Sequence, residues 1–406
     1  MLAGFIEALF LQSGYNAALV AIGAGLLGIA AGAGGTFLFL RKRALVSDAV
    51  AHATLPGIGL AFIIMVLLGG DGRNLTGLLI GSAITAAIGL YLIDWIVRRT
   101  RLAEDAAIGA ILSVFFGLGI VILTVIQTMN RGRQAGLESF LLGSTAGMLF
   151  QDAVIIAAGG ALAVTLVIVL RRPMTTVAFD PDYAAASGLN VRALDLAMMG
   201  LVMAVTVIGL KVVGLILIVA MLIIPAVTAR FWTDRTERVV IIAGVLGGVA
   251  GYIGAALSAS APALPTGPII VLVSFAIFTV SLLFAPHRGV LAALLTHRRF
   301  QVRVHHRQGL LALARNEPIH DPMTLEVLRR EGLIRKDRVA TDAGKAQAAK
   351  ALRDEKRWEI ARQIHQDEAV SDRYDGLTPI EDVLTRDEID DIDRRIGPPV
   401  VVESAG

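Results

Sequence analysis

The chain has 406 residues, a formal net charge of +3 at pH 7 and no cysteine, and 55% of its residues are hydrophobic. A mean hydropathy of +0.70 excludes an ordinary soluble domain and indicates an all-α polytopic membrane protein. The lack of cysteine excludes disulfides, thiolate metal sites and cysteine nucleophiles. The first forty residues show no basic start followed by a small-residue cleavage site, so we expect no removable signal peptide.

Apolar runs that can cross a bilayer of about 30 Å follow one another over the first two thirds of the chain. We predict nine transmembrane helices, with eight as the alternative if a turn near Lys211 is absent. The predicted spans are residues 16–40, 44–69, 75–97, 106–127, 152–170, two spans within 193–230 that turn at 209–211, 239–257 and 267–284. A shorter apolar run at 137–149 is expected to be interfacial or re-entrant.

Basic residues set the expected orientation of these spans. They concentrate in alternate connections, at 41–43, 98–101, 171–192 and 230–238, and again after 287. Because short cytoplasmic loops carry an excess of lysine and arginine, we expect the N-terminus outside and the C-terminus in the cytoplasm.

The second predicted span opens with a polar motif, SDAVAHATLPGIGL, at residues 47–60. Asp48 and His52 are four residues apart, so a helix places them on one face about 5–6 Å apart at Cβ. A carboxylate and an imidazole at that spacing suit a divalent transition metal. Alternatively, the two form a hydrogen-bonded pair near the membrane surface. The cost of ionisable residues within a span favours an ion pathway.

Proline and glycine residues mark positions where the helices can bend or pack closely. Pro56 lacks an N–H and so frees the carbonyl of His52, a possible third oxygen ligand. Pro56, Gly57 and Gly59 in this span, and Pro225 in a later one, are the candidate hinge or packing positions. A static kink at Pro225 is an equally good interpretation.

The polar connection at 171–192 contains a predicted short helix. Asp180 can cap it, Pro181 suits the first turn, and Asp182 complements the helix dipole. Gly188 suits the left-handed position that ends it. The predicted element comprises Asp180, Pro181, Asp182, Tyr183, Ala184, Ala185, Ala186, Ser187 and Gly188. This helix is either a binding site for a soluble partner or a connector that only packs against the neighbouring helices.

Several segments together resemble a known family. They are SDAVAHATLPGIGLAF at 47–62, FDPDYAAASGLNV at 179–191, KVVGLILIVAMLIIPAVTAR at 211–230 and LPTGPIIVLV at 264–273. In these segments the membrane part, residues 16–286, resembles the permease subunit of the manganese, zinc and iron family of ABC importers. The chain itself has no GxxxxGK[ST] phosphate loop, so it is expected to be a transport subunit and not an enzyme.

The resemblance implies a set of roles and partners. Asp48 and His52 match the positions where the family coordinates the transported ion, which is manganese first, or zinc or ferrous iron, with no organic cofactor. The 180–188 helix would couple to a cytoplasmic ABC ATPase. An extracytoplasmic binding protein would deliver the metal, and a second permease copy, identical or related, would complete a dimer in the bacterial cytoplasmic membrane. The alternative is an ATP-independent secondary carrier or channel that uses the same pair.

The composition changes after His287, so we predict a permease domain at 1–286, a cytoplasmic extension at 287–397 and a disordered end at 398–406. Residues 332–359 and 379–397 resemble metalloregulators of the diphtheria-toxin-repressor family, which implies an α/β winged-helix-like fold. Glu355, Glu381 and Asp382 are the candidate regulatory metal ligands. The basic segment 297–307 is expected to contact lipid headgroups, whereas the acidic second part argues against nucleic acid.

Overall fold

The computed structural model describes residues 2–70, 72, 74–129, 150–261, 264–364 and 374–396. The predicted interfacial segment at 137–149 and the predicted disordered end at 398–406 lie outside these residues. The described chain is mostly helical, and its contacts divide it into two compact units, Met1–Ala292 and Ala293–Gly406. We call them the membrane unit and the tail.

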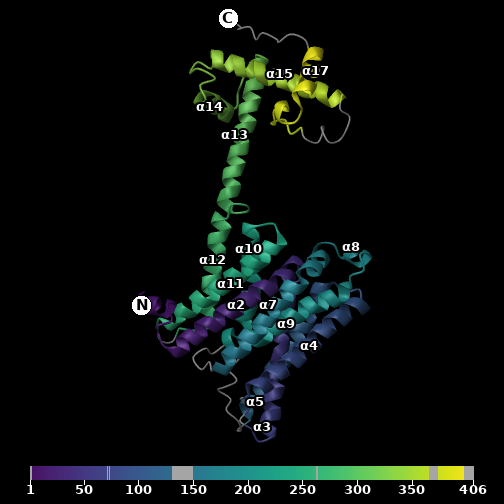
Figure 1. Ribbon diagram of the computed structural model, residues 1–406, viewed down its shortest axis with the longest axis vertical. Helices are drawn as coiled ribbons and strands as arrows, with labels where there is room; N and C mark the ends of the chain where they lie inside the picture. The colour runs from purple at the N-terminus through teal and green to yellow at the C-terminus, as the bar shows by residue number, and fades with distance from the viewer. Residues whose placement is uncertain are drawn as a thin grey trace. The chain divides into compact units, whose positions relative to one another are not determined.

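The membrane unit is a bundle of apolar helices (Figure 1). Its helices are α1 (Leu2–Leu9), α2 (Tyr15–Leu40), α3 (Ala44–Leu67), α4 (Leu75–Arg99), α5 (Glu104–Thr128), α7 (Phe150–Phe179), α8 (Pro181–Ala186), α9 (Val191–Val213), α10 (Leu215–Trp232), α11 (Thr236–Ala259) and α12 (Thr266–Phe284). Within the described residues, eight of these are long and apolar enough to cross a membrane: α2, α3, α4, α5, α7, α9, α11 and α12. The chain is therefore a multi-pass membrane protein.

The predicted count of nine spans is not supported. The apolar stretch at 193–230 does divide into two helices, but α10 has 18 residues and falls among the shorter apolar helices. The division also lies at Gly214 and not at the predicted 209–211. Gly214 has φ +83°, a conformation that costs little only for glycine, whereas Gly209 stays helical with Ile218 packed closely against it.

A second correction concerns the loop predicted to begin at Arg171. Helix α7 instead continues through Pro173 to Phe179. Proline sacrifices one helical hydrogen bond, but Met174 and Val177 in the last turns are fully buried in the core. Burial of these two side chains offsets the cost of the proline, so the connection shortens to one residue before α8 and four after it.

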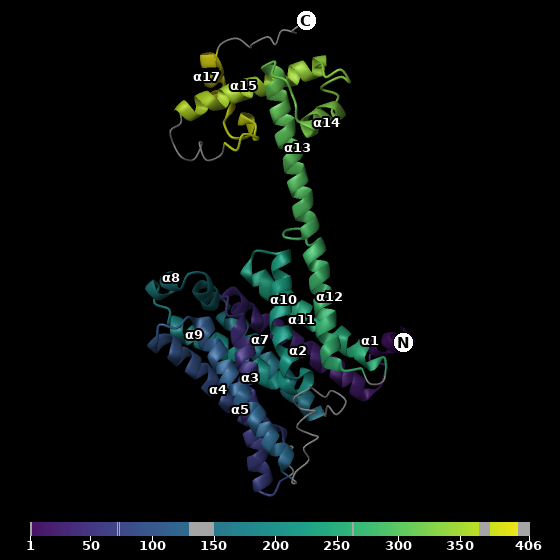
Figure 2. The same ribbon diagram turned by 180° about the vertical axis from the view of Figure 1, so that it is seen from behind.

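Small residues allow the central helices to approach closely. Helices α2 and α11 cross where a Cβ added to Gly28 would collide with the carbonyl of Gly247. On another face α3 packs between α4 and α5 (Figure 2). A Cβ on Gly57 of α3 would collide with the carbonyl of Gly81 in α4. Such contacts are typical of membrane bundles, where backbone proximity maximises van der Waals packing.

The tail contains α13 (Val290–Ala314), which begins just before it, α14 (Pro322–Arg330), α15 (Asp342–Ile364), the 3-10 turn η1 (Ile380–Asp382) and α17 (Arg386–Ile396). The predicted winged-helix strand pair is not supported: the described tail contains a single bridge, between Ile334 and Ala340. The segment between α14 and α15 turns tightly at Arg338, with φ +67°, and α15 begins two residues after the bridge. Too few residues remain to extend two strands.

Candidate metal centre

Helix α3 carries the candidate metal ligands and is held firmly at its start. The turn from α2 to α3 is three residues long, and Lys42 at its centre has φ +59°. Ser47 is fully buried, and its hydroxyl donates to the carbonyl of Ala44 at 2.6 Å. That bond satisfies the serine within its own helix, so Asp48 and His52 in the following two turns are the polar side chains that remain available.

Asp48 and His52 lie together, as the spacing predicts. Asp48 Oδ1 is 3.4 Å from His52 Nε2, and the side chains are 42% and 17% exposed, respectively. Two ligands at about 2.1 Å from one ion in a tetrahedral arrangement are themselves about 3.4 Å apart. The observed separation therefore suits two ligands of one cation.

The histidine ring is oriented by packing. Phe116 of α5 contacts it edge to face, with ring centroids 5.0 Å apart. Nδ1 is buried and has no hydrogen-bond partner within the described residues, while Nε2 faces the carboxylate. Pro56 lies inside the helix one turn later, which leaves the carbonyl of His52 without its usual helical donor.

Asp48 and His52 are the two candidate ligands at this place. Among the described residues no three His, Cys, Asp or Glu side chains come together in a way that could hold a metal ion. A four-coordinate site built on this pair would use two further ligands.

The remaining hinge candidates are packing positions in this structure. A Cβ on Gly59 would press on Ile122 of α5, as one on Gly57 would on α4. Pro225 lies inside α10, and its ring is near the backbone of Gly247. These contacts account for the small residues by close helix packing, and bending at them stays a prediction.

The short helix α8 forms as predicted, over Pro181–Ala186. The Asp180 carboxylate accepts a hydrogen bond from the Tyr183 N–H at 2.8 Å, and Gly188 has φ +85°. Tyr183 is 64% exposed while Ala184 is fully buried. The helix is therefore anchored on one side and presents the other to its surroundings.

Two of the three candidate regulatory ligands of the tail, Glu355 and Glu381, form ion pairs with basic side chains. Glu355 accepts from Arg307 at 2.9 Å and from Tyr374 at 2.9 Å. Burial, together with this bond to Glu355, raises the pKa of Tyr374. Glu381 lies 3.5 Å from Arg357 and 3.7 Å from Lys350, and Asp382 ends η1. Glu355 and Glu381 therefore serve as ion-pair partners in this structure.

Sequence reasoning missed a cluster of charges beneath α3. Asp195 of α9 pairs with Arg41 at 2.8 Å and with Arg43 at 3.3 Å, and Arg43 also pairs with Glu104 at 2.7 Å. The sequence suggested only that the arginines orient the protein. The one available signal was Asp195 itself, an isolated acid in an apolar span.

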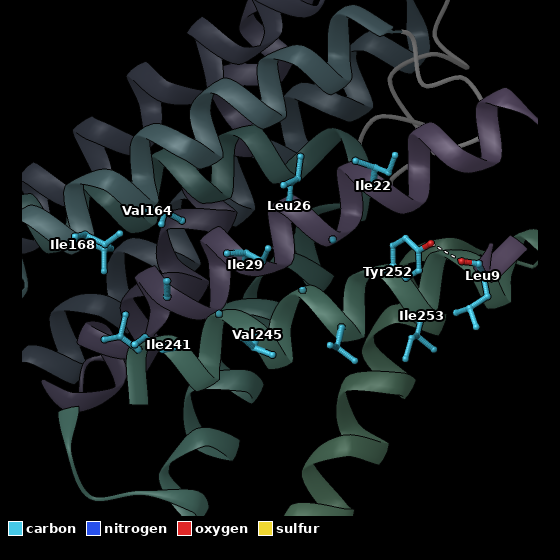
Figure 3. Close-up of a pocket in the computed structure, with 17 residues that line it drawn as sticks. Leu9, Ile22, Leu26, Ile29, Val164, Ile168, Ile241, Val245, Tyr252 and Ile253 are labelled. Atoms are coloured by element: carbon cyan, nitrogen blue, oxygen red, sulfur yellow. Dashed lines mark hydrogen bonds between the residues drawn. The ribbon is translucent and has the colours of Figure 1, made fainter. Parts of the chain in front are cut away.

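An apolar cavity lies elsewhere in the membrane unit. It has a volume of about 790 Å³ and is bounded by α2, α7 and α11 (Figure 3). Its lining is almost entirely aliphatic, including Ile29, Val164, Ile168 and Val245, and the Tyr252 hydroxyl at one end donates to the carbonyl of Leu9 at 2.6 Å. Such a lining offers no ligand to a metal ion.

The sequence of the chain matches a known protein family. Residues 15–285 match the model of the ABC 3 transport family. The chain is 41% identical over 308 residues to the manganese transport system membrane protein MntC of Bacillus subtilis (strain 168), covering 76% of this chain and 70% of the relative. It is 37% identical over 289 residues to the zinc transport system membrane protein TroC of Treponema pallidum (strain Nichols), covering 71% and 95%.

A solved structure agrees in fold. PsaBC from Streptococcus pneumoniae in complex with Fab contains a chain that matches with a TM-score of 0.61 and 30% identity, over 71% of this chain and 98% of that one. The chain therefore belongs to the ABC 3 transport family.

Proposed function

We propose that the chain is the permease subunit of an ATP-driven importer that moves a divalent transition metal ion across the bacterial cytoplasmic membrane. Manganese is the first candidate, with zinc or ferrous iron as alternatives. The named relatives are manganese and zinc transport proteins, which supports this range of ions. The single observation that carries the proposal is the Asp48–His52 pair, 3.4 Å apart at the start of an otherwise apolar helix.

The ligand chemistry supports the choice of cation class. A neutral imidazole and a carboxylate bind manganese, ferrous iron and zinc, and the chain has no cysteine to favour softer ions. His52 binds through Nε2 because that atom faces Asp48, and the ring is held by Phe116. Asp48 is the more exposed of the two, at 42% against 17% for His52.

A second permease copy completes the site in this proposal. Two copies would contribute two aspartates and two histidines, a four-ligand set that one copy lacks. The incomplete site within the described residues supports this assembly. ATP hydrolysis takes place on a cytoplasmic ATPase that docks at α8, and an extracytoplasmic binding protein supplies the ion. The N-terminus outside and the C-terminus inside stay our expected orientation.

For the tail we propose a role in assembly, through contact with the ATPase or with a second tail. Its candidate metal-binding carboxylates already pair with Arg307 and Arg357, which supports a structural role over metal sensing. The basic stretch of α13 contacts anionic lipid headgroups in this proposal.

The deciding experiment is metal uptake by cells that carry the whole transport system, with wild-type permease or with Asp48→Ala or His52→Ala. We expect uptake of one ion to fall by about 10- to 100-fold in each variant, the range for losing a partner within a metal site. Assembly with the ATPase is measured on the same membranes and should be unchanged. The ion whose uptake collapses identifies the substrate.

A matched control is Asp105→Ala, an exposed acid at the start of neighbouring α5, which should leave uptake unchanged. Uptake that persists in Asp48→Ala and His52→Ala would make the pair structural and defeat the proposal. The secondary-carrier alternative is tested by an ATPase partner that binds but does not hydrolyse ATP. Uptake that continues with such a partner would favour the carrier.

A further inference from the structure

A charge cluster joins four helices at one end of the membrane unit, and the proposed transport chemistry does not use it. It comprises Arg41 and Arg43 in the turn before α3, Glu104 at the start of α5 and Asp195 near the start of α9. We call these four residues the ion-pair link. Their side chains are only 13% to 29% exposed, so their mutual attraction is screened less than that of surface pairs.

The link reaches both sides of α8. Arg41 Nη2 binds the Asp195 carboxylate at 2.8 Å, and Arg41 Nη1 donates to the carbonyl of Val177 at 3.0 Å. Val177 lies in the last turn of α7, directly before α8, and Asp195 lies just after it, in the second turn of α9. One guanidinium therefore ties together the two helices between which α8 is suspended.

The link also reaches the helix that carries the metal pair. Arg43 is the capping residue of α3, five positions before Asp48, and it contacts both Asp195 and Glu104. The turn that contains the two arginines is short and internally bonded, with the Arg43 N–H donating to the carbonyl of Leu38 at 3.0 Å. Because this turn is short and hydrogen-bonded, a displacement of Asp195 would also displace the first turn of α3.

The carboxylate of Asp195 retains a free oxygen. Both of its ion pairs use Oδ2, whereas Oδ1 is buried and has no hydrogen-bond partner within the described residues. The Arg41 Nε is in the same state. Arg41 and Asp195 could therefore pair through these two atoms instead, with no further charged group needed.

We propose that Arg41, Arg43 and Asp195 are positioning residues that transmit movement of α8 to Asp48 and His52. The inference rests on the proposed function, because it assigns α8 to an ATPase and α3 to the metal. Movement of α8 shifts the start of α9, Asp195 carries the arginine turn with it, and the start of α3 changes its tilt. The ion-pair link would then couple ATP hydrolysis to exposure of the metal site.

The test is the number of metal ions transported per ATP hydrolysed by the complete transporter in liposomes, with manganese, zinc and ferrous iron each supplied as the probe. The variant is Asp195→Asn, and Asp195→Glu tests whether a retained charge rescues it. The matched control is Asp94→Asn. Asp94 is equally buried, at 14% exposure, and pairs with Arg98 at 2.7 Å and Arg192 at 3.2 Å, but it touches neither arginine of the turn before α3.

We expect Asp195→Asn to assemble and hydrolyse ATP within about twofold of wild type while transporting about tenfold fewer ions per ATP, a typical size for lost coupling. Asp195→Glu should recover part of that ratio, and Asp94→Asn should keep the wild-type ratio. A merely structural role would instead lower assembly, hydrolysis and uptake in proportion. An Asp195→Asn ratio equal to that of Asp94→Asn would overturn the inference.

Failure of the proposed function gives a different result. Wild-type transporter that hydrolyses ATP but imports none of the three metals would overturn that function, whereas normal wild-type uptake with an unchanged ratio in Asp195→Asn would overturn only the ion-pair link.

A probe on α3 keeps the test decisive if Asp195→Asn fails to assemble. Because the chain has no cysteine, Leu45→Cys in the first turn of α3, where the leucine is 53% exposed, allows a single spin label. Addition of ATP to the assembled complex should change its spectrum, and Arg43→Gln should abolish the change. An identical nucleotide response in Arg43→Gln would contradict the inference.

Discussion

The membrane unit and the tail are both helical, but different forces hold them together. Where α2 meets α11, glycines 28, 32, 247 and 251 place one backbone against the other. In the tail, α15 is held instead by a fully buried tryptophan, Trp358, and by arginine–carboxylate pairs such as Arg357–Asp393 at 2.6 Å. Lipid gives helices no hydrophobic gain on association, so the membrane unit relies on close packing. Water gives that gain in the tail.

This difference makes the effects of substitution predictable. In the membrane unit, adding a methyl group at a helix contact should lower stability. In the tail, removing a buried side chain should lower stability. The two units also differ in where their ion pairs lie. In the membrane unit the described ion pairs gather near helix ends, whereas in the tail they run through the packing around Trp358 and Asp354.

The largest expected effect is that of Trp358→Ala in the tail. The indole is fully buried, donates to the carbonyl of Thr378 at 3.0 Å and packs at a tilt against the Tyr374 ring, with centroids 5.1 Å apart. Its removal should destabilise the tail by about 3–5 kcal/mol. Hydrogen exchange of α15 and α17 in the full-length chain measures this, with Trp358→Phe as the milder variant. Unchanged protection in Trp358→Ala would show that the tail does not depend on this core.

A smaller effect is expected from Gly28→Ala in the membrane unit. The new methyl group would collide with the carbonyl of Gly247, and overpacking of this kind costs about 1–3 kcal/mol. The midpoint of thermal aggregation in detergent should fall. The control is Gly200→Ala in α9, where a built Cβ meets nothing within 4 Å and alanine gains up to about 1 kcal/mol of helix propensity. Equal midpoints for the two variants would refute the close-packing account.

Asp393→Asn should destabilise the tail by about 1–2 kcal/mol at neutral pH, because the carboxylate accepts charged hydrogen bonds from Arg357 and Arg353. The hydrogen bond from Arg357 holds the pKa of Asp393 below its usual range. The stabilisation is therefore present above the unfolded pKa of about 3.9 and is lost as pH falls through the folded pKa. Tail unfolding measured against pH should show wild type and Asp393→Asn converging below about pH 4. A constant gap would assign the effect to packing.

The smallest effect is predicted for Asp391→Asn, two residues away on the same helix. Asp391 is 47% exposed, and its partners Arg394 and Arg395 are more exposed still. Such surface pairs contribute about 0–1 kcal/mol, so the stability of the tail should stay close to wild type. A loss as large as that of Asp393→Asn would mean that burial does not separate the two.

Local pattern in the sequence was enough to locate most of the helices and the candidate site. Hydrophobic run length predicted α2, α4, α5 and α12 to within about two residues at each end, the usual uncertainty of helix boundaries, and α11 to within about three. Asp48 and His52 were found because two ionisable residues one turn apart are conspicuous in an apolar helix. The ends of α8 were predicted because an aspartate side chain caps a helix start and a glycine adopts positive φ at little cost, as Asp180 and Gly188 do here.

Tertiary contacts decided the rest. The helix α7 continues through Pro173 because Met174 and Val177 find a buried environment, and no local pattern states that. Strands did not form between α14 and α15 because too few residues separate the bridge from the next helix. Arg41, Glu104 and Asp195 come together from three distant segments, so their pairing is a property of the fold. Sequence determined which residues bear charge and where most of the apolar helices lie, because both follow from local composition; only packing determined which charges meet.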